Sequence, residues 1–98
     1  MDRASTLRHD HMPSYLVEQY FPKSRLPELH LEASRTEAAA RELAGDGVRI
    51  RYLRTTFLPD DETCFHLVEA TGTDEVGELC RRAGLGHARI TRAVDELI

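Results

Sequence analysis

Two amphipathic helical segments set among four short strand-like segments predict an α+β fold for this chain. The hydrophobic period changes from two residues in the strand-like segments to about 3.6 in the helical ones, and turn residues separate the segments. The segments follow one another as strand, helix, strand, strand, helix, strand. This is the split β-α-β order, so we expect a single ferredoxin-like domain with a four-stranded antiparallel sheet and two helices on one face.

The first half of the chain is predicted to contain an arm, a strand and a helix. Residues 1–13 are polar and non-periodic, which predicts a flexible arm in front of a domain over residues 14–98. Aromatic and β-branched residues over 14–21 predict the first strand, and a loop should follow over 22–27. A helix is expected over 27–44, because its apolar side recurs at helical spacing: Leu29, Ala33, Thr36, Ala40 and Leu43.

A β-hairpin is predicted after this helix. Gly45-Asp46-Gly47 supplies the glycine that is common just past a helix C-terminus. Residues 48–58 and 63–70 then read as two strands, and Pro59-Asp60-Asp61 provides a turn between them. Strands joined in this way should be antiparallel neighbours.

The last predicted elements are a second helix and a fourth strand. Thr71 or Thr73 is expected as the N-cap of the helix, and Gly84 as its end. Residues 87–94 carry Ile90 and Val94 and predict the final strand.

Composition excludes several classes of function. The formal net charge of -4 gives no general attraction to nucleic acids or anionic membranes. The sequence has no apolar run long enough for a membrane span and no signal-peptide core, so we expect a cytoplasmic protein. Cys64 and Cys80 lack the CxxC spacing of a zinc ribbon and are expected to be thiols.

The strand over 63–70 is predicted to place Cys64 and His66 side by side, because alternate residues of a strand face opposite sides of a sheet. When the most apolar set of each strand is placed against the helices, the predicted core contains Tyr15, Val17, Leu53, Phe57, Phe65, Leu67, Ile90 and Val94. The open face then receives Leu16, Glu18, Tyr20, Tyr52, Arg54, Thr56, Cys64, His66, Val68, Arg89 and Thr91, with His87 at a strand start. This mixture predicts a half-buried pocket or a homodimer interface.

Four short segments carry a family resemblance: Tyr15-Leu16-Val17-Glu18, Tyr52-Leu53-Arg54-Thr55, Leu67-Val68-Glu69-Ala70 and Ala83-Gly84-Leu85. In this order they resemble domain of unknown function family 4242, small bacterial proteins similar to the dimeric ferredoxin-like α/β barrels, with nickel-binding members. The resemblance spans residues 14–94 and implies a homodimer through the open sheet face and a nickel site. The chain departs from the family at His66, where cysteine is usual, and at Gln19, where arginine is usual.

Metal binding is the main functional hypothesis. His66 and Cys64 offer imidazole and thiolate, which bind nickel and similar divalent transition metals, and Glu18 or His87 would complete the site across the sheet. A second candidate site is His9-Asp10-His11 in the arm. The alternative for His66 is a histidine that only hydrogen-bonds a carboxylate such as Glu18.

A small-molecule-binding or enzymatic dimeric barrel is the alternative function, with a polar pocket of Tyr52, Arg54, His87 and Arg89 on the open face. Glu18, His66 and Arg54 could supply a base, an acid and an anion clamp, although Glu18 and Arg54 could equally form an ion pair between subunits. The sequence contains no nucleophile motif, phosphate loop or cofactor fingerprint, which makes catalysis the less favoured hypothesis. It also lacks the glycine-aromatic signature of an RNA-recognition module.

Overall fold

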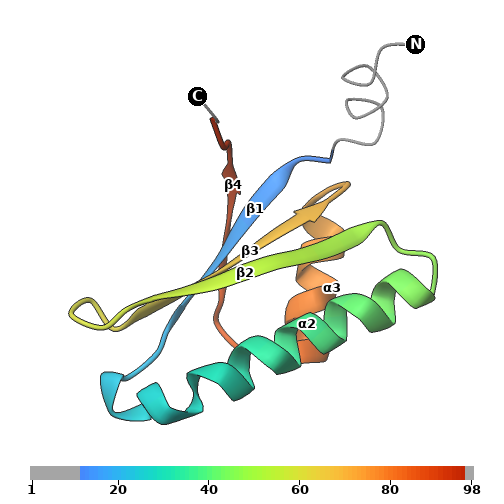
Figure 1. Cartoon of the computed structure of the whole chain (residues 1–98). Coiled ribbons are helices and arrows are strands. Elements are labelled where there is room, and N and C mark those ends of the chain that lie inside the picture. The colour runs from blue at the N-terminus through green and yellow to red at the C-terminus, as the bar shows by residue number, and fades with distance from the viewer. Residues whose placement is uncertain (1–11, 97–98) are drawn as a thin grey trace.

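The predicted ferredoxin-like α+β fold is confirmed in the computed structural model, which describes residues 12–96. The elements are β1 (Ser14–Tyr20), a short 3-10 helix η1 (Lys23–Glu28), α2 (Leu29–Gly45), β2 (Ile50–Leu58), β3 (Thr63–Ala70), α3 (Thr73–Ala83) and β4 (Arg89–Ala93). The strands form one sheet in the order β2-β3-β1-β4, in which all neighbours are antiparallel. Figure 1 shows α2 and α3 on the same side of this sheet.

The predicted metal site in the arm lies outside the described residues. Most of the expected arm, with His9 and His11, lies before residue 12. Over residues 12–96, no helix is both long and apolar enough to cross a membrane.

Several element boundaries differ from the prediction; β2, for example, begins at Ile50 and not at residue 48. Residues 22–27, expected as a loop, largely belong to η1. The residue at the N-cap of α3 is Gly72, in an extended conformation, so neither threonine caps this helix through its side chain. β4 begins only at Arg89, because His87 has a φ of 43°, a left-handed conformation that a strand does not tolerate.

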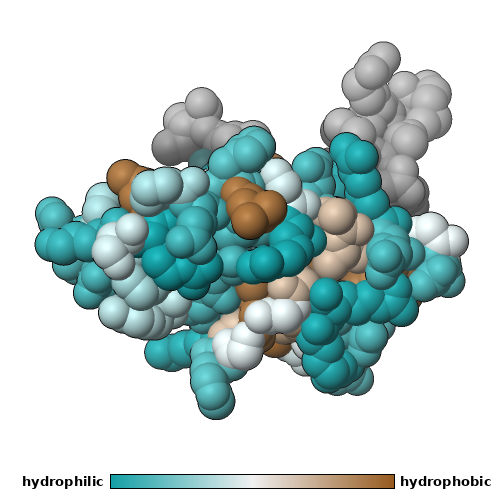
Figure 2. Space-filling model, turned by 90° about the horizontal axis from the view of Figure 1, so that it is seen from below, coloured by the Kyte–Doolittle hydropathy of each residue, from teal (hydrophilic) through white to brown (hydrophobic). Residues whose placement is uncertain are grey.

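The core lies between the sheet and the two helices. Leu43 of α2 and Val76 and Leu79 of α3 are fully or almost fully buried against the sheet. The sheet contributes its helix-facing residues to the same cluster: Tyr15, Val17, Ile50, Val68 and Ala70. Most of the surface on the α2 side is hydrophilic, and apolar residues form small separate areas there (Figure 2).

The predicted orientation of β3 is wrong. His66 pairs with Val17 and Val68 pairs with Tyr15, and directly paired residues share a face of the sheet. Because Val17 and Tyr15 belong to the core, His66 and Val68 also lie beneath the helices, together with Cys64. Phe65 and Leu67 therefore face the open side. Both faces of β3 are apolar, so residue size did not reveal which one the helices cover.

The predicted orientation of β2 is wrong at Tyr52. The pairing with β3 shifts between Tyr52 and Arg54, which makes Leu53 the extra residue of a β-bulge. As a result Tyr52 and Phe57 both face the helices, although an even number of residues separates them. Arg54 and Thr56 face the open side, as predicted.

Gly84, the residue that ends α3, provides a test of this fold. Its φ of 71° is left-handed, and no neighbouring atom would touch an added Cβ. We expect Gly84→Ala to lower the free energy of unfolding by about 1 kcal/mol through backbone strain alone. Gly86→Ala is the matched control, because Gly86 has an ordinary φ and open space around it. Equal free energies of unfolding for the two variants in urea would contradict the left-handed conformation of Gly84 at the end of α3.

Candidate functional site

His66 is the centre of a buried polar network between β3 and α2. Its side chain has no exposed surface. Its Nδ1 lies 2.7 Å from Thr55 Oγ1, and Thr55 is the residue directly opposite it on β2. Its Nε2 lies 3.9 Å from Cys64 Sγ and 3.9 Å from Glu32 Oε2. Strand alternation brings Cys64 beside His66, and the packing of α2 brings Glu32 to the same point.

Glu32 reaches this network from α2, where only 4% of it is exposed. Its Oε2 accepts a hydrogen bond of 2.5 Å from Gln19 Nε2, and its Oε1 accepts one of 2.8 Å from Arg35. Its backbone oxygen accepts the hydroxyl of Thr36 at 2.9 Å. A buried carboxylate is costly unless such donors satisfy it. Gln19 and Arg35 thus hold Glu32 in place beside His66.

A second set of hydrogen bonds connects His66 to the edge of the molecule. Tyr52 is half-buried, and its hydroxyl lies 2.6 Å from Thr55 Oγ1, which in turn contacts His66 Nδ1. Each hydroxyl can donate in either direction, so the chain supports both neutral tautomers of the imidazole. When Nδ1 carries the proton and donates to Thr55, the lone pair of Nε2 points to the region between Cys64 and Glu32.

Both central groups are uncharged at neutral pH. Burial lowers the pKa of His66 from 6.5, and the nearby Glu32 carboxylate opposes this shift only in part. Burial, followed by the charge of Glu32, raises the pKa of the Cys64 thiol to about 11. The 3.9 Å approach of Glu32 to His66 is therefore a contact with a neutral ring rather than an ion pair. A thiol in this state is a poor nucleophile, which argues against Cys64 as a covalent catalyst.

The structure separates several residues that were predicted to share one site. Cys64 and His66 do lie together, but beneath the helices, while Glu18 lies on the opposite face of the sheet. Glu18 shares a shallow polar hollow with His87 and Arg89 at one end of the sheet. Arg54 lines a different hollow on the open face, and Tyr52 lines a cleft on the helix side. The predicted pocket of Tyr52, Arg54, His87 and Arg89 is thus not one pocket.

Sequence reasoning missed Glu32, Gln19 and Thr55. A signal for Glu32 was present, because positions 32, 36, 40 and 43 follow one side of a helix and the last three are apolar or small. Gln19 shares the face of Tyr15 and Val17 by alternation. Thr55 could not be placed, because its orientation depends on the bulge at Leu53.

The groups near His66 that could bind a metal are the thiol of Cys64 and the carboxylate of Glu32. Within residues 12–96, no three His, Cys, Asp or Glu side chains are already arranged so that they could hold a metal ion. Comparisons of the sequence and structure with family models, curated proteins and solved structures found no match. The resemblance to family 4242 therefore stays a prediction.

The buried state of His66 predicts a pH dependence of stability for the chelator-treated protein. The folded pKa lies below the unfolded value, so the unfolded chain binds the proton more readily. Stability is full above about pH 6.5 and falls as the pH drops from there toward the folded pKa, by at most about 1.4 kcal/mol per pH unit for one histidine. We expect His66→Gln to reduce this slope between about pH 7 and about pH 5.5 in urea unfolding.

His30→Gln is the control for this measurement. His30 lies exposed on α2, where its ring is 3.4 Å from the Ser34 hydroxyl. This variant should keep the pH slope of the unaltered protein. A His66→Gln variant with an unchanged slope would show that His66 is not buried in its neutral form.

Proposed function

We propose that this protein binds nickel or a similar divalent transition metal, with Cys64 and His66 as its donors. The observation that carries the proposal is the 3.9 Å separation of Cys64 Sγ and His66 Nε2 on one buried strand face. Metal–sulfur and metal–nitrogen bonds of about 2.3 and about 2.05 Å put two donors about 3.6 Å apart in a tetrahedral site. The pair is thus within a few tenths of an ångström of a ligating separation.

Glu32 is the third donor that we assign to this site. It is a carboxylate 3.9 Å from His66 Nε2 and sits on a different element from the other two donors. Its Oε2 at present accepts from Gln19, so metal binding would exchange that hydrogen bond for a metal bond. Thr55 would orient the imidazole by accepting from Nδ1, as partners of metal-bound histidines commonly do.

The protonation states of the two donors favour a cation. A neutral imidazole is the ligand form of histidine, whereas the Cys64 thiol must lose its proton when it binds a metal. The raised pKa of this thiol reflects a buried site without a positive charge to balance a thiolate. A divalent cation supplies that charge, so binding should release about one proton and should tighten as the pH rises.

Calorimetric titration with Ni²⁺ tests this proposal. For chelator-treated protein we expect about one metal per chain, and a heat that changes with the ionisation enthalpy of the buffer because Cys64 releases its proton. His66→Ala should abolish uptake, and Thr55→Val should weaken it about 10-fold to about 100-fold through loss of the imidazole partner. His30→Ala is the control and should bind normally. Titrations with Ni²⁺, Zn²⁺ and Co²⁺ that all give no heat would refute metal binding and leave a structural network.

The open sheet face favours a second copy of the chain as partner. Leu16, Phe65 and Leu67 lie on this face, which no helix covers in the described part of the chain. These residues, with Arg54, Thr56 and Leu58, line a shallow hollow of about 270 Å³. Leu67 is already buried in one copy, but Leu16 and Phe65 are only half-buried, and two such faces packed together would remove both from water.

A small-molecule site in that dimer is the second candidate function. The hollow is almost entirely apolar, and Arg54 is the charged residue in its lining. A closed hollow of this kind suits an apolar molecule that carries one carboxylate, which a guanidinium binds through two parallel hydrogen bonds.

Light scattering tests the dimer. We expect twice the mass of one chain at micromolar concentration, and Phe65→Glu should shift the protein to a monomer because it buries a charge in the interface. Ser34→Glu adds the same charge on the exposed side of α2 and should leave the mass unchanged. A monomeric unaltered protein would overturn the proposed interface.

A further inference from the structure

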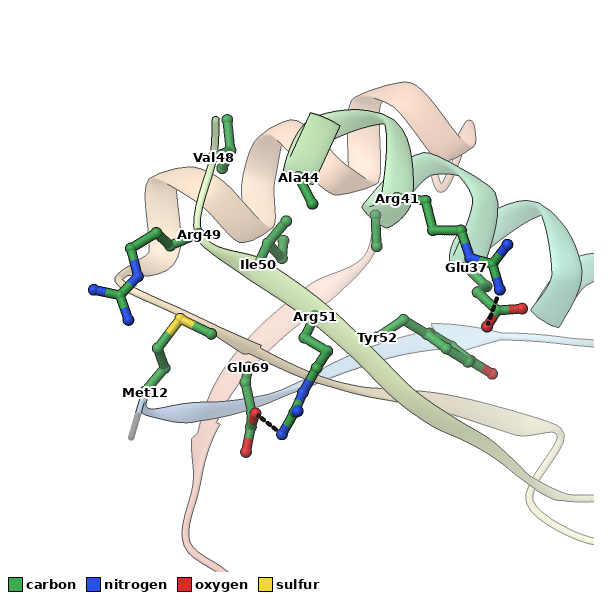
Figure 3. Close-up of a pocket in the computed structure, with 11 residues that line it drawn as sticks. Met12, Glu37, Arg41, Ala44, Val48, Arg49, Ile50, Arg51, Tyr52 and Glu69 are labelled. Atoms are coloured by element: carbon green, nitrogen blue, oxygen red, sulfur yellow. Dashed lines mark hydrogen bonds and ion pairs between the residues drawn. The ribbon is translucent and has the colours of Figure 1, made fainter. Parts of the chain in front are cut away.

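A cleft separates the edge strand β2 from α2 (Figure 3). It has a volume of about 760 Å³ and includes none of Cys64, His66 and Glu32 of the proposed metal site. Two of its lining residues, Arg51 and Glu69, face the open side of the sheet. Its apolar lining comes from both walls: Ala40, Ala44, Val48, Ile50 and Tyr52. The apolar residues that α2 contributes are the short Ala40 and Ala44, which leave room for another side chain, while Glu37 and Arg41 of the same helix also line the cleft.

The outer edge of β2 is free to bind a further strand. β2 stands at one end of the strand order, and no strand of the described chain pairs with its outer side. Free backbone N–H and C=O groups along such an edge are a template for an added strand. The bulge at Leu53 interrupts regular geometry, and the N–H of Val48 already donates to Leu43, so the usable edge is the first three residues of β2, 50–52, with Arg49 before them.

The charges around the cleft are mainly positive, although the whole chain carries -4. Three arginines line it against two glutamates. Arg51 pairs with Glu69 at 2.7 Å, and Arg41 pairs loosely with Glu37 at 3.6 Å. Arg49 makes no ion pair within the described residues 12–96. In Figure 3 its side chain extends from the end of the cleft near Met12.

We propose that the cleft binds an extended acidic peptide segment of another protein, as an additional strand on β2. The free edge would supply backbone hydrogen bonds, the space beside Ala40 and Ala44 would hold one small apolar side chain, and Arg49 would bind a carboxylate of the peptide. A second copy fits less well. Antiparallel pairing of two β2 edges would bring the arginines at 49 and 51 of both copies together, and like charges in opposed positions are destabilising.

Fluorescence anisotropy with a labelled heptapeptide of alternating glutamate and valine tests this proposal. We expect saturable binding that weakens with salt, and amide shifts in NMR confined to residues 49–52 and the facing side of α2. Replacing each glutamate by lysine, or methylating alternate backbone nitrogens, should abolish binding. Ala44→Leu fills the cleft and Arg49→Glu reverses its free charge, so each should weaken binding by at least about tenfold.

The matched control is Ala38→Leu, the same change at an exposed position of α2 outside the cleft. It should bind the peptide as the unaltered protein does. Equal binding of the lysine or methylated peptide, or no binding of the glutamate peptide, would overturn the proposal. So would a dimer that Ala44→Leu dissociates in the absence of peptide, because a second copy would then occupy the edge.

Discussion

The packing of α2 on the sheet depends on one buried side chain, the imidazole of His66, which lies between Thr55 and Glu32. It joins three elements, because His66 comes from β3, Thr55 from β2 and Glu32 from α2. A buried polar side chain is tolerated only when its partners are in place. Over the described residues, no buried side-chain nitrogen or oxygen lacks a hydrogen-bond partner. The network therefore fixes how α2 lies on the sheet as well as where its own atoms lie.

The same arrangement argues against covalent chemistry and is the basis of the proposed cation site. Removal from water keeps both the Cys64 thiol and the His66 imidazole neutral, which leaves Glu32 as the charged member of the three. Arg35 balances that charge from the exposed side of α2. Tyr52 has two roles in the architecture, since its ring lines the cleft beside α2 and its hydroxyl belongs to the hydrogen-bond chain that ends at His66.

The sequence predicted the order of elements well and their orientation poorly. Helical spacing and turn residues depend on neighbours in the chain, so β3 was placed at its observed bounds and α2 within two residues of its observed ends. Which face of β3 meets the helices depends on its partners in space. Phe65 is larger than Cys64 or Ala70, yet it faces the open side. The pairing of His66 with Val17 and of Val68 with Tyr15 turns the face that carries the smaller residues inward. The bulge at Leu53 likewise has no local signal that would have placed Tyr52 inside.

The buried network exists only if Cys64 lies on the side of the sheet that the helices cover. The reactivity of the Cys64 thiol is therefore the most direct test. A Cys80→Ser variant leaves Cys64 as the one thiol. With a pKa of about 11 instead of 9.0, the thiolate fraction at pH 8 falls from about one in ten to about one in a thousand. The folded Cys80→Ser variant should therefore react with iodoacetamide at least about a hundredfold more slowly than the same variant unfolded in urea. Equal rates would place Cys64 on the open face and would contradict the buried network.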